Sequence, residues 1–160
     1  MDKLWAPWRN KYISSLKKKR GCIFCRAVKT PKQKLVVFKT RHSICMLNIF
    51  PYNNGHLMVC PLKHTAELSA LNEREILDLF HALLKAQGLL QAVLKPQGYN
   101  IGMNLKRTSG AGITGHLHVH IVPRWNGDTN FMPVLGQTKV ISESLRHLHK
   151  RLKDAYAKAN

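Results

Sequence analysis

The chain has 160 residues and a formal charge of +18, because it holds 26 Lys and Arg against 8 Asp and Glu. This length fits one domain with its own hydrophobic core, and the charge favours polyanionic partners such as nucleotides, nucleic acid or anionic lipid. No apolar run approaches the about 18 residues of a membrane span, and the polar, Trp-containing start lacks the apolar stretch of a signal peptide. We therefore expect a cytoplasmic protein with no membrane partner.

The first twenty residues differ in character from the rest. They combine Trp5, Pro7, Trp8 and Tyr12 with the basic run 17–20, and they show no clear periodicity. Two Trp so close to a terminus predict that this segment docks onto its own domain or onto a second subunit. The sequence is thus divided into an N-terminal arm, 1–20, and a single domain, 21–160.

Short apolar segments predict strands at 35–39, Ser43–Leu47 and 57–60. A long helix follows, with Asn72 as N-cap and Glu75 three residues later, a pairing related to the capping box. Apolar residues recur along it at helical spacing until Pro96 and Gly98: Ile76, Leu79, Phe80, Leu83, Leu84, Leu90, Val93 and Leu94. We expect this helix to be core scaffold, with His81 at its surface or half-buried.

The second half of the chain predicts a strand at 99–105, a flexible basic loop at 106–112, a turn at 126–128 and a terminal helix at 139–157. That helix would turn four apolar residues inward, namely Ile141, Leu145, Leu148 and Leu152. Strands grouped around one long helix, without regular strand–helix alternation, predict an α+β domain with a mostly antiparallel sheet.

Residues 116–121 read His-Leu-His-Val-His-Ile. On a strand, His116, His118 and His120 would share one face, and the apolar residues between them would be buried on the other. The alternative, histidines met by chance on a solvated strand, is less favoured for three in register. A neutral imidazole is a competent nucleophile at phosphorus, and the central His118 is the best placed to carry a nucleotidyl group. The glycines of the preceding loop, 109–115, could bring backbone N–H groups near an anion, although they could equally only form the turn.

The triad, followed by Val122, Pro123 and Arg124, resembles the signature of the histidine triad (HIT) superfamily, whose members hydrolyse or transfer nucleotides through a covalent nucleotidyl-histidine. Leu47-Asn48, Gly55-His56-Leu57-Met58-Val59 and Pro61 are similar to that family's nucleoside-binding strand pair and its supporting histidine. The resemblance extends over residues 20–150 and implies a HIT-like fold.

Three further segments resemble a bacterial diadenosine tetraphosphate phosphorylase group, a branch similar to the fragile-histidine-triad hydrolases: Trp5-Ala6-Pro7-Trp8-Arg9, Ala111-Gly112-Ile113, and residues 124–131. This likeness implies that His118 is the nucleophile, that His120 contacts the phosphates or the leaving group, and that His56 supports the site. It also implies that Asn48 binds the ribose and that Asn104 lies near the phosphates. The resemblance to histidine triad proteins in general also implies a homodimer. Mg²⁺ could accompany the substrate, since metal-bound polyphosphate is a reasonable substrate form.

One departure from the family pattern lies just before the triad. Many relatives carry Gly-Gln-Ser/Thr, whereas this chain has Gly112-Ile113-Thr114. A polar group that would touch phosphate is therefore absent, and the hydroxyl of Thr114 would replace it if the loop were one residue shorter.

Cys22 and Cys25 form a Cys-x-x-Cys pair. Such a pair needs two more ligands to complete a tetrahedral zinc site, and His64 and His116 are the candidates. The family resemblance implies a structural zinc ion on Cys22, Cys25, His64 and His116. A thioredoxin-like redox pair and two buried structural thiols remain as alternatives. Cys45 and Cys60 lie in apolar strand-like runs, which is typical of buried free thiols.

We therefore expect an enzyme that acts on dinucleoside polyphosphates through a nucleotidyl-His118 intermediate, with phosphate or water as acceptor. A nucleoside phosphoramidate or aminoacyl-adenylate hydrolase is the nearest alternative, although such proteins usually end soon after the triad. A nucleic-acid-binding or end-processing module is the other alternative. It is not favoured, because the sequence has neither an aromatic-and-basic stacking motif nor a second Cys and His cluster after residue 126.

Overall fold

The computed structural model describes residues 21–31, 35–130 and 140–159, so the predicted N-terminal arm lies outside the described residues. Five antiparallel strands form one sheet in the order β1-β2-β3-β5-β4. The strands are β1 (Val36–Lys39), β2 (Ser43–Leu47), β3 (Leu57–Pro61), β4 (Gly98–Met103) and β5 (Val119–Arg124). The helices are α2 (Ile23–Lys29), α3 (Glu73–Leu94) and α5 (Leu145–Lys158), with a short 3₁₀ turn, η2 (Leu68–Ala70). The predicted α+β class with a mostly antiparallel sheet is confirmed.

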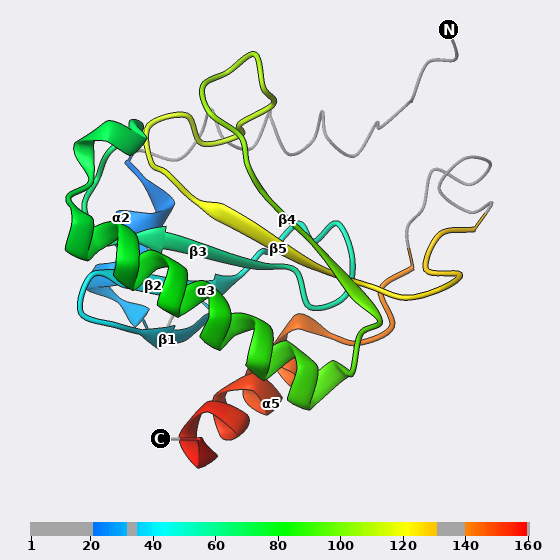
Figure 1. The fold of residues 1–160 in the computed structure, drawn as a ribbon. Coiled ribbons are helices and arrows are strands. Elements are labelled where there is room, and N and C mark those ends of the chain that lie inside the picture. Colours follow the sequence, from blue (N-terminus) through cyan, green and yellow to red (C-terminus); the bar gives the residue numbers. More distant parts are fainter. Residues whose placement is uncertain (1–20, 32–34, 131–139, 160) are drawn as a thin grey trace, which may run out of the picture.

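Helices cover both faces of the sheet. The long helix α3 and the terminal helix α5 pack on one face, and α2 lies against the other (Figure 1). Alternate residues of β2 serve the two layers: Cys45 and Leu47 belong to the main core under α3 and α5, whereas Ile44 and Met46 pack with Phe24 of α2. Every residue of β2 and β3 is buried. Cys45 and Cys60 are buried free thiols, as predicted.

The predicted capping box starts α3. The Asn72 side chain accepts a hydrogen bond from the Glu75 backbone N–H (3.0 Å), and the Glu75 carboxylate accepts one from the Asn72 N–H (2.9 Å). The helix buries Leu79, Ala82, Ala86, Leu89 and Leu90 against the sheet.

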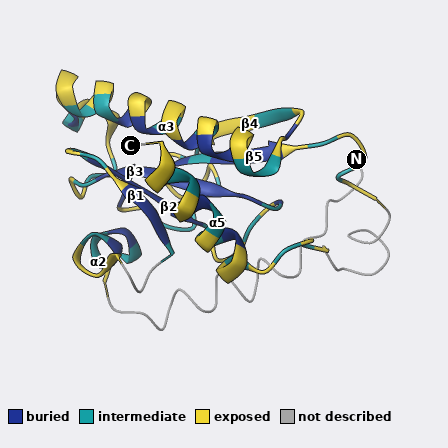
Figure 2. Ribbon diagram, turned by 90° about the horizontal axis from the view of Figure 1, so that it is seen from below, coloured by how far each residue is buried: buried dark blue, intermediate teal, exposed yellow. Residues whose placement is uncertain are grey.

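The prediction that α3 is core scaffold holds for only one of its faces. Ile76, Phe80 and Leu84, counted among its core positions, are exposed, as is His81. Figure 2 shows the exposed outer side of α3 along its length. By length and mean hydropathy alone, α3 could cross a membrane, but the core helix of a globular domain meets the same two criteria. In this structure the buried face of α3 packs on the sheet.

Element boundaries differ from the sequence prediction by one or two residues at β1, β3 and β4, and by more at the triad strand and the terminal helix. The triad strand β5 begins at Val119 rather than His116, because its partners β3 and β4 both pair up to Val119 and no further. Before that point Leu117 donates its N–H to the Thr65 carbonyl (2.7 Å). The terminal helix begins at Leu145, because Ser144 accepts a hydrogen bond from the His147 N–H and acts as N-cap. Leu148 and Leu152 are buried as predicted, whereas Ile141 and Leu145 are only half-buried.

The two edges of the sheet differ. At one edge, β1 is short and its register shifts between Val36 and Phe38. There His149 of α5 donates its Nε2–H to the carbonyl of Val36 (2.8 Å). At the other edge, β5 is the single partner of β4 among the described strands, and Ile101 of β4 is 47% exposed.

Candidate active site

The three triad histidines lie on the face of the sheet that α2 covers. Leu117, Val119 and Ile121 alternate with them and belong to the main core on the opposite face, so the predicted division of side chains is confirmed although the strand starts later. His116 and His118 are buried, whereas His120 is half-buried. Phe24 of α2 packs against His116 and His118, with ring centroids 5.2 Å and 4.9 Å away.

The hydrogen bond of His118 defines its tautomer. Its Nδ1 lies 2.8 Å from the backbone carbonyl of His116, an oxygen that can only accept, so Nδ1 carries the proton. The lone pair is therefore on Nε2. Burial lowers the pKa of His118 despite this bond, which keeps the ring neutral near pH 7. His118 thus has the protonation state that a nucleophile requires.

A second chain of contacts defines the tautomer of His120. The Tyr52 backbone N–H donates to His56 Nδ1 (3.1 Å), so the proton of neutral His56 is on Nε2. His56 Nε2 lies 2.9 Å from His120 Nδ1, which must then accept. The remaining proton of His120 is on Nε2, free to donate. Burial lowers the pKa of His120 to about 4, so it acts as a neutral hydrogen-bond donor near pH 7.

His118 and His120 therefore present opposite groups. Their ring centroids are 4.8 Å apart and the planes are nearly perpendicular, at 76°. One ring offers an unprotonated Nε2 and its neighbour a protonated one. Such a pair can attack a phosphorus atom and donate to an oxygen bonded to it.

Cys22, Cys25, His64 and His116 converge on one point, and their ligand atoms all lie within 4.8 Å of one another. His116 Nδ1 is 3.3 Å from Cys22 Sγ and 3.2 Å from His64 Nδ1, and Cys25 Sγ is 3.2 Å from His64 Nδ1. A tetrahedral zinc ion with bonds of about 2.3 Å to sulfur and about 2.0 to 2.1 Å to nitrogen would separate its ligands by about 3.3 to 3.8 Å. The donor set fits this ion.

The hydrogen bond of His116 Nε2 also fits a zinc ion at this cluster. This nitrogen donates to the Pro61 carbonyl (2.8 Å), which leaves a lone pair on Nδ1, toward the cysteines. The four predicted ligands are thus brought together from the start of the domain, the segment after β3 and the triad.

The other predicted nucleotide-binding residues lie at the ends of β2 and β4 and in the loop before the triad. Asn48, at the end of β2, places its amide Nδ2 3.4 Å from His56 Nδ1. Asn104 is half-buried, directly after β4. Gly112 and Thr114 belong to the loop that leads into the triad; Thr114 is exposed, and Ile113 between them packs with the α2 cluster.

Asp128 anchors the loop that carries Tyr52 and His56. It accepts hydrogen bonds from Arg124 (2.6 and 2.9 Å), the Trp125 N–H (3.1 Å) and the amide of Asn53 (2.8 Å). The bonds from Arg124 hold the pKa of Asp128 well below its usual range. Part of the segment after β5 that resembles the phosphorylase group therefore has a structural role, because Asp128 holds the loop before β3 in place.

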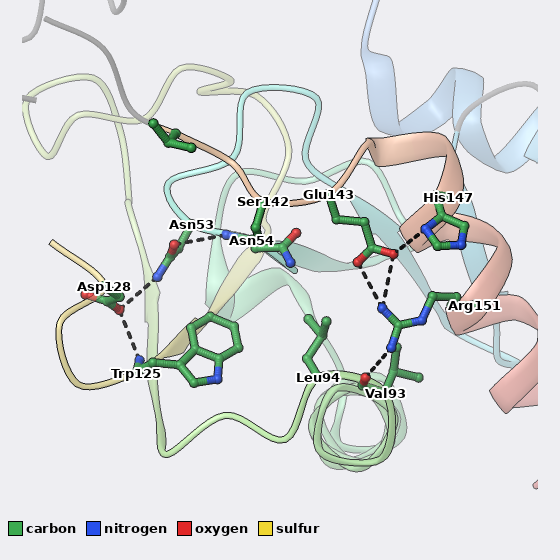
Figure 3. A pocket seen from close by; sticks show the side chains of 11 residues that line it. Asn53, Asn54, Val93, Leu94, Trp125, Asp128, Ser142, Glu143, His147 and Arg151 are labelled. Carbon is green, nitrogen blue, oxygen red and sulfur yellow. Dashed lines mark hydrogen bonds and ion pairs between the residues drawn. The ribbon is translucent and has the colours of Figure 1, made fainter. Parts of the chain in front are cut away.

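A cavity of about 670 Å³ lies next to Asn53, Trp125 and Asp128. Figure 3 shows Trp125 on one side of it and Glu143, His147 and Arg151 on the other. Glu143 accepts from both nitrogen-bearing neighbours, His147 (2.7 Å) and Arg151 (3.0 Å). None of the described triad histidines lines this cavity.

Sequence reasoning missed two residues of the site. Tyr52 was not among the predicted site residues, yet its ring contacts His56 and His120. Phe24, inside the Cys-x-x-Cys pair, was not among them either, yet it packs on His116 and His118. An aromatic residue inside a Cys-x-x-Cys pair was the available signal for Phe24; nothing in the sequence singled out Tyr52.

Comparison with known proteins agrees with this geometry. The family model described as "HIT domain" matches residues 29–127. The chain is 35% identical to the "AP-4-A phosphorylase" of Mycobacterium tuberculosis, over 99% of this chain and 86% of that protein. It is 32% identical to the asymmetrical bis(5′-nucleosyl)-tetraphosphatase of Schizosaccharomyces pombe, over 62% of this chain and 54% of that protein.

The fold is shared with solved structures. A Zn-bound histidine triad family protein from Mycobacterium smegmatis superposes with a TM-score of 0.71 at 22% identity, over 87% of this chain and 95% of that one. The family-model match covers more than half of the 160 residues, and the phosphorylase match covers nearly the whole chain. The chain therefore belongs to the HIT family and is an enzyme of that family.

Proposed function

We propose that this protein is a dinucleoside polyphosphate phosphorylase that converts diadenosine tetraphosphate and phosphate into ATP and ADP. The observation that carries the proposal is the pair of opposite tautomers, with an unprotonated Nε2 on His118 and a protonated Nε2 on His120. The 35% identity to the mycobacterial phosphorylase supports this substrate class.

In the first step His118 Nε2 forms a bond to the α-phosphorus, and the bond from that phosphorus to the bridging oxygen breaks. ATP leaves, and the Nε2–H of His120 donates a hydrogen bond to the departing oxygen. The imidazolium formed on His118 keeps its Nδ1 proton, which the His116 carbonyl accepts at 2.8 Å. In the second step a phosphate oxygen attacks the same phosphorus, ADP forms, and His118 returns to its neutral state.

Incubation with diadenosine tetraphosphate and Mg²⁺, with and without phosphate, tests this function. ADP and ATP formed only with phosphate support a phosphorylase. AMP and ATP formed without phosphate would make water the acceptor and identify a hydrolase. The control is His118→Ala, which should form neither product set; turnover at the wild-type rate by this variant would rule out the His118 intermediate.

A second candidate function rests on another relative. The chain is 30% identical to the adenosine 5′-monophosphoramidase of S. pombe, over 66% of this chain. Adenosine 5′-phosphoramidate, assayed in parallel, distinguishes the two: a higher kcat/KM on this compound than on diadenosine tetraphosphate would favour the phosphoramidase.

We also propose that Cys22, Cys25, His64 and His116 hold a structural zinc ion. The convergence of the four ligand atoms supports this assignment, as does the Zn-bound relative from M. smegmatis. When bound, zinc would tie α2 to the triad. Four protein ligands leave no position for a reactive water, so we assign the ion no part in the chemical steps.

Finally, we propose a homodimer joined through α3 and β4. Both elements expose large apolar side chains, including Leu77 (55%), Phe80 (53%), Leu84 (64%) and Ile101 (47%). A groove of about 310 Å³ lies between them, lined by Phe80, Leu83, Ile101 and Leu105 among others. A second copy of the same surface would cover these side chains, and none of the described strands pairs with the outer edge of β4.

A further inference from the structure

Tyr52 lies beside the histidine pair, and its ring is only partly covered by the protein. Its ring packs on His56 (centroids 4.6 Å apart, planes at 36°) and on His120 (5.7 Å, 33°). Half of the residue nevertheless remains exposed, at 49%. The ring thus covers the histidine pair with one part of its surface and presents the rest to solvent.

Supporting His56 does not require this ring. The hydrogen bond to His56 Nδ1 comes from the Tyr52 backbone N–H, which every residue except proline could supply. Two neighbours in the same loop, Ile49 (48%) and Phe50 (44%), are exposed as well. Exposed apolar side chains gathered beside reactive groups mark a surface that a ligand covers.

The two sides of the reacting pair differ in what lies beside them. On the His118 side, the fully buried Phe24 fills the space against the ring. On the His120 side lies the exposed ring of Tyr52. In the mechanism proposed above, His120 donates to the departing oxygen, so the leaving group would depart on the side of Tyr52.

We propose that Tyr52 is a stacking platform for the nucleobase of the leaving nucleotide, so that the second nucleoside of a dinucleoside polyphosphate is bound at the mouth of the site. This proposal rests on the proposed function, because only a substrate of that class has a second nucleobase. An aromatic ring stacks on any base, so the platform would select for the presence of a second nucleoside rather than for its identity.

Two substrates with the same transferred group test the platform. Diadenosine tetraphosphate and adenosine 5′-tetraphosphate both place an adenylyl group on His118, but the second releases a triphosphate without a nucleoside. In Tyr52→Leu, which keeps the backbone N–H, the ratio of kcat/KM for the first substrate to that for the second should fall about five- to tenfold, mainly through KM. Tyr52→Phe, which keeps the ring, should retain the wild-type ratio.

Inhibition provides a readout that does not depend on the chemical step. Tyr52→Leu should weaken inhibition by ATP, the leaving nucleotide, and weaken inhibition by tripolyphosphate less. An unchanged ratio of the two kcat/KM values would overturn the platform. If both values fell equally, Tyr52 would be a support for His56. If the wild-type protein processes neither substrate, the proposed function itself fails, which is a separate outcome.

Discussion

The ring of Phe24 lies 4.9 Å from the ring of His118, with the two planes inclined at 36°. Phe24 is fully buried, and it sits between Cys22 and Cys25, two of the four residues that would hold zinc. The segment that carries half of the metal ligands therefore also covers the nucleophile. A change in the Cys and His cluster should therefore alter the position of His118, although none of the four side chains would bond to the substrate.

Loss of the metal ligands should consequently lower both stability and activity. We expect Cys25→Ser to reduce bound zinc from about one ion per chain to nearly none and to lower Tm by about 10 °C, since a structural zinc ion contributes several kcal/mol of folding free energy. Metal analysis and thermal unfolding measure these effects. Cys45→Ala, at a buried cysteine outside the cluster, is the control and should retain zinc. Full zinc loading of Cys25→Ser would contradict the assigned ligand set.

Phe24 should matter to catalysis beyond its share of the core. Phe24→Ala should cost about 3 to 5 kcal/mol of unfolding free energy. Phe24→Leu should cost less, bind zinc normally and still lower kcat, because the His118 ring loses the surface that fixes it. Phe38 offers a matched control, since it is equally buried but stacks on Tyr156 in the other layer. If Phe38→Leu lowers kcat as much as Phe24→Leu, the effect comes from general destabilisation.

His56 should act only through His120. His56→Phe keeps a ring next to Tyr52 but removes the donor to His120 Nδ1, so we expect kcat to fall about 10²-fold. The double variant His56→Phe/His120→Asn should then lose no more activity than His120→Asn alone, because both changes remove one interaction. Additive losses in steady-state assays would show that His56 has a role of its own.

Stability should fall in acid through His120. Its pKa is lowered from 6.5 to about 4 by burial, so the unfolded chain binds more protons than the folded one between these values. The free energy of unfolding is therefore highest above pH 6.5. It falls as the pH is lowered toward 4, by at most about 1.4 kcal/mol per pH unit through this one group. The loss of Tm between pH 7 and pH 4.5 should therefore be smaller in His120→Asn than in the wild type. Identical losses would mean that His120 does not titrate in this range.

The dimer can be tested on the exposed face of α3. Leu84→Glu puts a charge where an apolar contact is expected, so light scattering should give a monomer in place of a dimer. Ala157→Glu, on the exposed end of α5, should leave the dimer intact. A monomeric wild-type protein would remove the proposal.

The parts of the fold that local signals specify were predictable. The start of α3 follows from the Asn72 and Glu75 side chains alone, and the end from Pro96 and Gly98. By contrast, α2 was not predicted, because it has seven residues, no side-chain cap at Cys22 and no acidic residue in its first turn. It is stabilised by the burial of Phe24 and Ala27, which depends on a sheet that the local sequence does not describe.

The same distinction applies to the site. The triad and the pair of Cys22 and Cys25 were identified from their spacing in the sequence, and His56 and His64 from the resemblance to the family. Their tautomers were not, since these depend on backbone groups of other segments, such as the Tyr52 N–H and the Pro61 carbonyl. The exposed face of α3 was likewise read as core, because helical periodicity records which residues are apolar and not what covers them.

The hydrogen bond from His149 to the Val36 carbonyl has a consequence for assembly. It occupies an acceptor on one outer strand of the sheet, and the register shift in β1 further spoils that strand as a template. In the dimer proposed above, a second chain would therefore add at β4 rather than at β1. An open polymer requires two strand edges in each subunit that can pair with a neighbour. A subunit with a single such edge forms a closed two-fold dimer. In such an assembly, the contact between α5 and β1 would disfavour open-ended growth of a fibre.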